Sequence, residues 1–233
     1  MSTEAEIPLT GGMVNPEVVR IGDTVHRVQG ENAAFAHQLL QWLEAAGFQE
    51  APRYLGVDDK GREILTYFDG TVLPGAGFKL NDEQLLNVAR LIRRYHDLTA
   101  GSFLKGDAEI IAHGELGPHN TVFQGDTLVG FIDWDSARPG TRLRDFAYAV
   151  DWYIDVANKK WPVLEQTRRL TLMCKAYGWD DSVQILRDIQ TDYRSALNNH
   201  QRRGNKQAIK IFTDLVAWVD TRVSEMIGIL QPQ

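Results

Sequence analysis

The sequence predicts an α+β protein with two parts, a small β-rich part followed by a larger, mainly helical part. Short β-branched runs separated by turn residues dominate residues 10–68. Helical periodicity dominates the chain after residue 144. Between these regions, residues 109–135 contain short apolar runs around a turn, which is typical of one internal β-hairpin. We therefore expect two domains, covering residues 1–68 and 69–233.

The composition is that of a globular chain. With 233 residues and 43% hydrophobic content, it can build a packed core of one or two domains. An apolar run of 18 residues is missing, so we expect no membrane-spanning helix. The N-terminal residues lack the basic and apolar regions of a signal peptide, and the single cysteine is typical of a reducing cytoplasm. The net charge of -6 argues against a nucleic-acid partner, and the sequence does not indicate an oligomeric state.

The first part of the chain contains three recognisable elements. Two β-branched runs, at residues 18–21 and 24–28, are separated by Gly-Asp and predict a hairpin. Apolar residues at helical spacing predict a helix over residues 32–46, and Gly47 is a natural stop for it. Residues 63–68, Glu-Ile-Leu-Thr-Tyr-Phe, predict a strand that leads into the second part.

The second part begins with a helix whose start is well defined. Asn81 and Gln84 have the spacing of a capping box, and apolar residues at helical spacing continue to about Leu98. His96 falls on the apolar side, so we interpret it as a histidine at the edge of the core. After the internal hairpin, the pattern predicts four more helices, over about 144–157, 162–177, 181–200 and 205–230.

The internal hairpin has polar side chains at one end. The turn Gln-Gly-Asp-Thr at residues 124–127 joins its two apolar strands. The polar groups at the opposite end are His113, Glu115 and Asn120 before the hairpin, and Asp133 and Asp135 after it. Two carboxylates and an amide oxygen grouped in this way suit Mg²⁺, which takes one or two carboxylates together with water and phosphate oxygens.

The same residues carry a resemblance to a known family. His-Gly-Glu-Leu-Gly-Pro-His-Asn at 113–120, followed by Ile-Asp-Trp-Asp at 132–135, resembles the catalytic loop and metal-binding motif of the aminoglycoside phosphotransferases and choline kinases. The resemblance implies a bilobal protein-kinase-like fold, with a small, shortened β-rich N-lobe and a mainly helical C-lobe. It implies that Glu115 orients the hydroxyl of a substrate, and that Asn120 and Asp133 hold Mg²⁺. The family has Asp at the position of Glu115.

The resemblance also assigns residues to a nucleotide, ATP or alternatively GTP, between the lobes. Gly11 and Gly12 would let the backbone approach a phosphate, since glycine permits such close contact, whereas a plain turn also explains this pair of glycines. Arg27 stands where the family carries a Lys for the α and β phosphates. At the hinge, Phe68 and Thr66 would offer a backbone N–H and a backbone C=O to the base.

Arg27 is a second departure from the family pattern. The planar guanidinium of arginine and the point charge of lysine are not equivalent phosphate ligands. Kinases steer that Lys with a Glu on the following helix, but the corresponding positions here are Ala36, His37 and Gln38. We therefore expect the ion pair to be absent, and His37 to be a surface or packing residue.

Two further assignments stay open at this point. In the family an Asp at the place of Asp145 braces the catalytic loop, whereas an ordinary N-cap ahead of an apolar helix explains the same residue equally well. Asp135 and Asp155, with neighbouring aromatic residues, are candidates for contacts to the acceptor, but core packing also accounts for those aromatics. Residues 151–233 hold 10 acidic and 12 basic residues, so the helical region shows no acidic excess for a polycationic substrate, although folding could cluster some of its acids.

The functional hypothesis is an ATP- and Mg²⁺-dependent phosphotransferase that acts on a hydroxyl of a small molecule. Phosphoryl transfer needs mainly positioning and charge neutralisation, which the expected site would supply. The alternative is a catalytically weakened or inactive relative that binds a nucleotide or another small ligand. The substitutions at Glu115 and Arg27 motivate this alternative.

Overall fold

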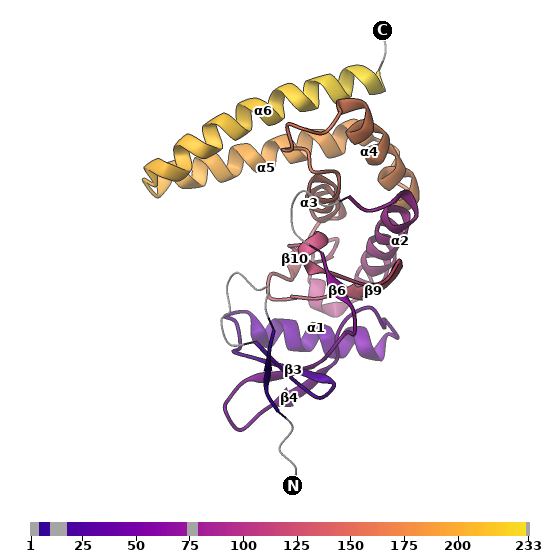
Figure 1. Cartoon of the computed structure of the whole chain (residues 1–233), viewed down its shortest axis with the longest axis vertical. Helices are drawn as coiled ribbons and strands as arrows, with labels where there is room; N and C mark the ends of the chain where they lie inside the picture. Colours follow the sequence, from indigo (N-terminus) through magenta and orange to yellow (C-terminus); the bar gives the residue numbers. More distant parts are fainter. Residues whose placement is uncertain (1–4, 10–17, 74–78, 232–233) are drawn as a thin grey trace.

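The computed structural model describes residues 5–9, 18–73 and 79–231, and it consists of two lobes (Figure 1). The N-lobe has a five-stranded antiparallel sheet in the order β1-β2-β3-β5-β4. Its elements are β1 (Ile7–Pro8), β2 (Val19–Ile21), β3 (Thr24–Arg27), α1 (Ala33–Ala45), β4 (Tyr54–Val57) and β5 (Glu63–Thr66). The helix α1 lies between this sheet and the C-lobe. This arrangement confirms the predicted α+β class with a small β-rich N-lobe.

Local sequence signals account for most of the N-lobe. The β2–β3 hairpin is confirmed, and its turn contains Gly22 at a φ of 56°, a left-handed conformation that glycine adopts without a Cβ penalty. The predicted helix is also confirmed, and its residues Leu39 and Leu43 are fully buried. In the sheet, β3 pairs with β5 so that Arg27 stands directly opposite Glu63. Side chains of directly opposed residues point to the same face of a sheet, so these two charges meet.

The C-lobe contains the predicted hairpin and five α-helices within the described residues. Strands β8 (Thr121–Gln124) and β9 (Thr127–Phe131) pair around the expected turn. The other elements are β6 (Thr71–Val72), α2 (Asp82–Thr99), β7 (Ile110–Ala112), β10 (Arg138–Gly140), α3 (Arg142–Ile154), α4 (Val163–Tyr177), α5 (Ser182–Arg202) and α6 (Lys206–Leu230), with short 3₁₀ turns η1 (Phe103–Lys105) and η2 (Pro118–Asn120). The short strands β1, β4, β6 and β10 were not among the predicted elements.

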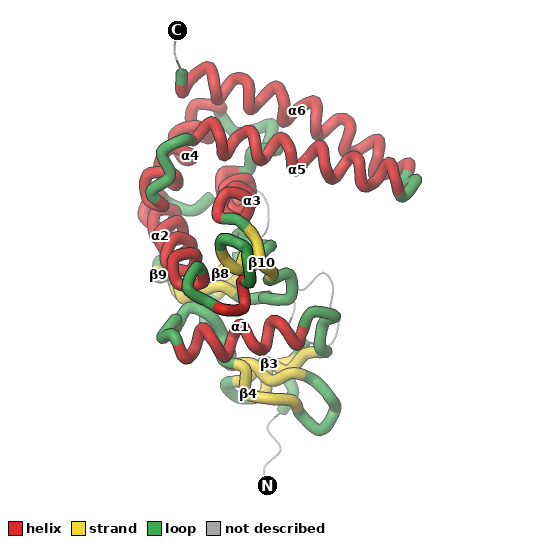
Figure 2. Tube along the Cα trace, turned by 180° about the vertical axis from the view of Figure 1, so that it is seen from behind, coloured by secondary structure: helices red, strands yellow, loops and turns green. Residues whose placement is uncertain are grey.

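Capping confirms two of the predicted helix starts. The side chain of Asn81 accepts the backbone N–H of Gln84, and the side chain of Gln84 accepts the backbone N–H of Asn81, which completes the capping box of α2. Asp181 caps α5 by accepting the N–H of Gln184. The helices α5 and α6 run side by side and form an arm that projects from the C-lobe (Figure 2).

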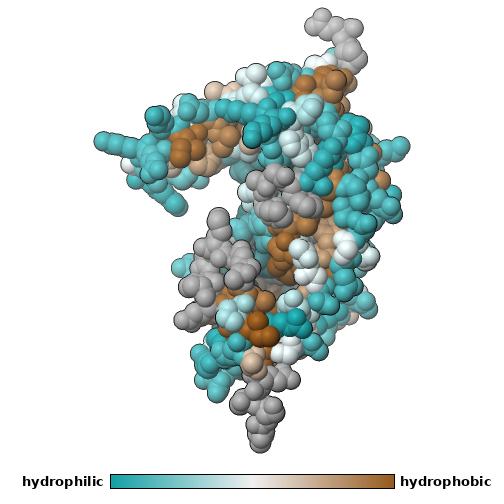
Figure 3. Space-filling model, in the orientation of Figure 1, coloured by the Kyte–Doolittle hydropathy of each residue, from teal (hydrophilic) through white to brown (hydrophobic). Residues whose placement is uncertain are grey.

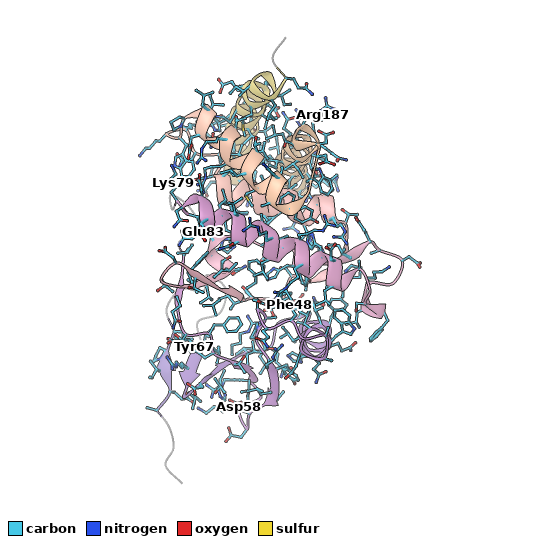
Figure 4. All side chains as sticks on the ribbon, turned by 90° about the vertical axis from the view of Figure 1, so that its right-hand side faces the viewer. Phe48, Asp58, Tyr67, Lys79, Glu83 and Arg187 are labelled. Carbon is cyan, nitrogen blue, oxygen red and sulfur yellow. The ribbon has the colours of Figure 1, made fainter. Side chains whose placement is uncertain are left out.

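The two lobes share one hydrophobic core. Leu39 and Leu43 of α1 belong to the same buried cluster as Ile92 of α2, and the rings of Phe48 and Tyr95 lie 5.9 Å apart across the boundary. Figure 4, in which Phe48 is labelled, shows α2 running across the side of the molecule above this contact. In the part of the chain that the structure describes, none of the helices has the length and apolar content needed to cross a membrane.

Candidate active site

Asn120 joins the loop of residues 113–120 to the segment that follows the hairpin. Its Nδ2 donates to the carbonyl of Glu115 at 2.9 Å, and its own carbonyl accepts the N–H of Ile132 at 2.9 Å. Asn120 is buried, whereas the Glu115 side chain is exposed. Since Asp133 follows Ile132 directly, hydrogen bonds and chain connectivity bring Glu115, Asn120 and Asp133 to one end of the hairpin.

Asp133 adopts an unusual backbone conformation. Its φ is 64°, and only one other non-glycine residue of the described chain, Asp155, also has a positive φ. Left-handed backbone costs an L-residue free energy and persists where the surroundings hold it, often at functional sites. Here His113 supplies part of that support, because its Nε2 donates to the carbonyl of Ile132 at 3.1 Å. Burial lowers the pKa of His113, which fits a neutral ring in a packing role against Trp134.

Asp145 braces the loop. Its carboxylate accepts the backbone N–H of His113 at 2.9 Å and that of Gly114 at 2.8 Å, and the Nε2 of His96 lies 3.0 Å from it. The N-cap of α3 is Thr141, whose hydroxyl accepts the N–H of Arg144. The prediction that Asp145 braces the catalytic loop is therefore confirmed, and the alternative that it caps helix α3 is wrong. His96 is fully buried rather than at the edge of the core.

The oxygen atoms of Asn120 and Asp133 suit a magnesium ion chemically. Asn120 uses its amide nitrogen to bind Glu115, so its amide oxygen remains for a cation. The side chain of Asp133 is 41% exposed, and its Oδ1 forms an ion pair with Arg27. Within the described residues, no group of three or more His, Cys, Asp or Glu side chains is arranged to hold a metal ion. Mg²⁺ does not require such a group, since phosphate and water oxygens complete its shell.

Arg27 occupies the centre of the interlobe site. Its Nε donates to Oε1 of Glu63 at 2.5 Å, its Nη1 to Oδ1 of Asp133 at 3.0 Å, and its Nη2 to Oδ1 of Asp135 at 2.6 Å. Burial by itself would lower the pKa of Arg27, but the charges of these three carboxylates raise it above its ordinary value. Arg27 is therefore a permanent cation that touches both lobes.

Arg27 has an acidic partner in the N-lobe, although not the helix residue that kinases use. This acid, Glu63, comes from strand β5, because the β3–β5 register places it opposite Arg27. His37 of α1 takes part as well, donating from Nε2 to Oε2 of Glu63 at 2.6 Å and stacking on Tyr54 at 3.8 Å. Sequence reasoning missed Glu63, although a charged residue in an otherwise apolar strand was a usable signal.

The expected nucleotide contacts fall in two groups. Gly11 and Gly12 lie outside the described residues. Thr66 ends strand β5, where its N–H donates to the carbonyl of Arg53 at 3.0 Å, and Phe68 lies just beyond the strand. This hydrogen bond uses the N–H of Thr66, whereas the group expected to contact the base is its carbonyl. The roles of Thr66 and Phe68 stay predictions.

Aromatic residues that could line a pocket for the acceptor molecule are mostly buried in the core. Trp134 and Tyr153 are buried, as core packing predicts. The carboxylate of Asp135 binds Arg27, so it lies against the N-lobe. Asp155 ends α3 with a φ of 52° and accepts the side-chain N–H of Asn158 at 2.8 Å. A role for Asp135 or Asp155 in acceptor binding stays a prediction.

Folding does cluster acids that are dispersed in the sequence. Burial raises the pKa of Asp151 to about 7, and the charges of Asp192 and Asp155 contribute in the same direction. The buried Oδ1 of Asp151 lacks a hydrogen-bond partner among the described residues. Tyr148, on the same helix, has a pKa raised to about 12 by burial and by the charge of Glu115. Tyr148 and Asp192 line one cavity beside the braced loop.

The described part of the protein has a cavity beside the loop and a second one farther away. One of about 150 Å³ lies beside the braced loop and is lined by Ala112, Gly114, Arg138, Gly140, Thr141, Arg144, Asp145, Tyr148 and Asp192. The larger, about 510 Å³, is lined by residues of α2 and the β8–β9 turn, such as Arg90 and Asp126, away from Glu115 and Asp133. The face in Figure 3 is hollowed below the α5–α6 arm. The smaller cavity is therefore the one that adjoins the candidate site.

The region of the candidate site is similar to known proteins. A family profile described as "Phosphotransferase enzyme family" matches residues 100–180, the region that contains the loop, the hairpin and Asp145. The trifolitoxin immunity protein of Rhizobium leguminosarum bv. trifolii is 36% identical over 151 residues, which are 58% of this chain. The match covers 56% of that relative, so the chain spans little more than half of its length.

Solved structures extend the comparison over most of the chain. The GDP complex of a mutant aminoglycoside 2'-phosphotransferase-IIIa has a TM-score of 0.65 at 14% identity, with 95% of this chain and 93% of that chain covered. Choline kinase from Cryptosporidium parvum Iowa II has a TM-score of 0.60 at 12% identity, with 97% and 89% covered. At these identities the similarity shows the fold. The chain thus has the protein-kinase-like fold of the aminoglycoside phosphotransferases and choline kinases, and its residues 100–180 match the phosphotransferase enzyme family.

Proposed function

We propose that this protein is a phosphotransferase that transfers the γ-phosphate of ATP, or of GTP, to a hydroxyl of a small molecule with the help of Mg²⁺. The observation that carries the proposal is the convergence of Glu115, Asn120 and Asp133 at one end of the β8–β9 hairpin. This part of the chain is also the part that the phosphotransferase family profile matches. The single buried cysteine, Cys174, fits a reducing cytoplasm as the place of the reaction.

Each residue has a defined task in this proposal. Bound Mg²⁺ would neutralise charge on the phosphates. Asn120 and Asp133 would hold the metal with an amide oxygen and a carboxylate oxygen. Glu115 is exposed and free to meet an incoming hydroxyl, whose proton it would accept. Asp145 would keep this loop in place through the N–H groups of His113 and Gly114.

The Glu at position 115 affects the expected rate. Its side chain is longer than that of Asp by one methylene, about 1.5 Å. A displacement of about 1 Å at a reacting group can cost ~10²-fold in rate. The loop holds the backbone of Glu115 through Asn120, so the extra length has to be absorbed by the exposed side chain or by the position of the acceptor.

A second candidate function is a nucleotide-binding or ligand-binding protein with weak or no transfer activity. The ion pair between Arg27 and Asp133 favours it, because this contact engages one oxygen of the expected metal ligand. The curated relative is described as an immunity protein, and either chemical modification or binding of a toxin could provide immunity. Two solved aminoglycoside phosphotransferases of the same fold are complexes with kanamycin and with gentamicin, which supports a small molecule as the ligand in both candidate functions.

A phosphate-transfer assay tests the proposal. ATP or GTP with Mg²⁺ is incubated with the protein and a panel of hydroxyl compounds that includes aminoglycosides, macrolides and choline, and transfer is followed by radiolabelled phosphate. We expect transfer in the wild-type protein and a loss of at least ~10²-fold in Asp133→Ala. The matched control is Asp107→Ala, which removes an exposed acid outside the site. Equal transfer in wild type and Asp133→Ala would reject the proposal.

A further inference from the structure

The guanidinium of Arg27 is shared among three carboxylates from two lobes. Glu63 belongs to the N-lobe, and Asp133 and Asp135 belong to the C-lobe. Each nitrogen of the guanidinium contacts a different carboxylate, at distances between 2.5 and 3.0 Å. The expected metal ligand Asp133 is thus in contact with a cation, Arg27, in this structure.

The two ends of this network differ in how firmly they are held. Glu63 is buried, with 2% of its side chain exposed, and it is also held by His37. The side chains of Asp133 and Asp135 are 41% and 33% exposed. Solvent-exposed ion pairs contribute little free energy, whereas buried charged pairs are costly to separate. Arg27 is therefore anchored on Glu63 and exchangeable on the side of the two aspartates.

A phosphate group can replace the aspartates as a partner of Arg27. The planar guanidinium binds phosphate and carboxylate with the same paired geometry. Moving to a phosphate would release Oδ1 of Asp133, while the Nε contact to Glu63 stays in place. Lysine could not reproduce this geometry, because its compact ammonium lacks the planar fork that presents separate N–H groups to separate carboxylates.

We propose that Arg27 is an exchangeable internal cation that holds Asp133 and Asp135 through the contacts described above and passes to a nucleotide phosphate on binding, so that a divalent metal gains Asp133 only together with the nucleotide. This inference rests on the proposed function and deepens it. The nucleotide phosphate removes Arg27 from Asp133, and the metal removes Asp133 from Arg27. Metal and nucleotide therefore bind cooperatively, and such coupling is reciprocal. The substitution of Lys by Arg becomes part of the binding mechanism rather than a defect.

The test measures metal binding without nucleotide, so it does not depend on transfer. Binding of Mn²⁺, a paramagnetic stand-in for Mg²⁺, is followed by electron paramagnetic resonance in the wild-type protein and in Arg27→Met. We expect Mn²⁺ to bind the variant roughly 10- to 100-fold more tightly, the factor that corresponds to removing one competing charged hydrogen bond. The gain should disappear in Arg27→Met combined with Asp133→Asn.

Arg20→Met is the matched control. Arg20 lies on the neighbouring strand β2, pairs with Asp23 and does not contact Asp133, so its loss should leave Mn²⁺ affinity unchanged. Should Arg27→Met fail to fold by circular dichroism, Arg27→Lys replaces it. This variant keeps the charge but loses the shared contacts, and it should bind Mn²⁺ measurably more tightly than wild type.

Two results would overturn the inference. One is wild-type affinity for Mn²⁺ as high as that of the Arg27 variant. The other is a gain that survives the loss of the Asp133 carboxylate, because the metal would then bind elsewhere. The two proposals can fail separately. If wild type and variants all lack phosphate transfer but differ in Mn²⁺ affinity as expected, the proposed reaction is rejected and the exchange at Arg27 is retained.

Discussion

The Nε2 atom of His96 lies 3.0 Å from Oδ2 of Asp145, and both side chains are almost completely excluded from solvent. A hydroxyl group, that of Tyr177, lies 2.7 Å from the other ring nitrogen of His96. Burial alone would raise the pKa of Asp145, but the hydrogen bond and charge of His96 lower it below its ordinary value. A charged Asp145 therefore supports the loop that presents Glu115, and helix α2 supports Asp145.

Replacing Asp145 by Asn should therefore destabilise both the fold and the loop. The amide keeps the shape of the carboxylate but presents a donor to the N–H groups of His113 or Gly114, so a buried donor loses its partner. We expect the free energy of unfolding to fall by about 1–3 kcal/mol. Urea denaturation measures this change. Asp107→Asn, at an exposed position, should leave the midpoint unchanged, and an equally unchanged midpoint in Asp145→Asn would contradict the bracing role.

Glu115→Gln should reduce transfer without affecting stability. The side chain is exposed, so the substitution removes an acceptor of the hydroxyl proton at little cost to the fold. General base catalysis contributes about 10²- to 10⁴-fold, and we expect a decrease in kcat of that order. Initial rates in the transfer assay give kcat, and thermal unfolding checks the fold. Retained kcat would exclude Glu115 as the base.

Glu115→Asp separates the two candidate functions. In an enzyme that has adapted to Glu, the shorter Asp should lower the rate, by roughly 10²-fold for a displacement near 1 Å. In a relative weakened by the longer arm, the same substitution should raise transfer above the wild-type level. Parallel rate measurements on wild type and variant decide between these outcomes. Titration calorimetry checks that the variant still binds nucleotide, and loss of that binding would show that neither outcome applies.

The raised pKa of Asp151 predicts a pH dependence of stability. Burial raises this pKa from the ordinary 3.8 to about 7, so the folded state holds the proton more firmly than the unfolded state. The unfolded state loses its proton first as pH rises, so Asp151 lowers the stability of the fold progressively between about pH 4 and pH 7. Asp151→Asn removes this effect, and its melting temperature should exceed that of wild type more at pH 8 than at pH 5. A pH-independent difference would contradict this assignment.

Gly130 marks a close approach of the two lobes. A Cβ at this position would lie 2.4 Å from the backbone carbonyl oxygen of Glu50, the same oxygen that accepts the N–H of Phe131 at 2.9 Å. Gly130→Ala should therefore destabilise the protein by about 1–3 kcal/mol through overpacking. Gly228→Ala is the control, because a Cβ there meets nothing within 4 Å and alanine favours a helix by about 1 kcal/mol. Equal stabilities of the two variants would show that the lobes can shift apart freely.

Much of the fold could be predicted because its signals are local. The β2–β3 hairpin follows from Gly-Asp between two β-branched runs, and the start of α2 follows from the spacing of Asn81 and Gln84. The two-residue strands β1 and β6 could not be predicted in this way. Such short segments carry no periodicity, and they become strands only because a neighbouring strand offers hydrogen-bonding groups.

The candidate site was predictable only in part for a similar reason. The motif at 113–120 and its distance to Asp133 indicated which residues would meet, since a hairpin of fixed length connects them. The motif did not reveal Glu63 as the acid beside Arg27, because that contact depends on the register between β3 and β5. It also left the role of Asp145 open, since an Asp near a helix start suits both a cap and a brace.

The sequence by itself determined the main helices, the two hairpins and the residues of the loop, because periodicity, turn chemistry and capping act over a few neighbouring positions. Only the tertiary structure decided that Thr141 rather than Asp145 caps α3, and that Arg27 binds Asp133 and Asp135 across the lobes. Electrostatic partners are chosen by distance in space. That distance is set when strand register and the shared core fix one lobe against the other.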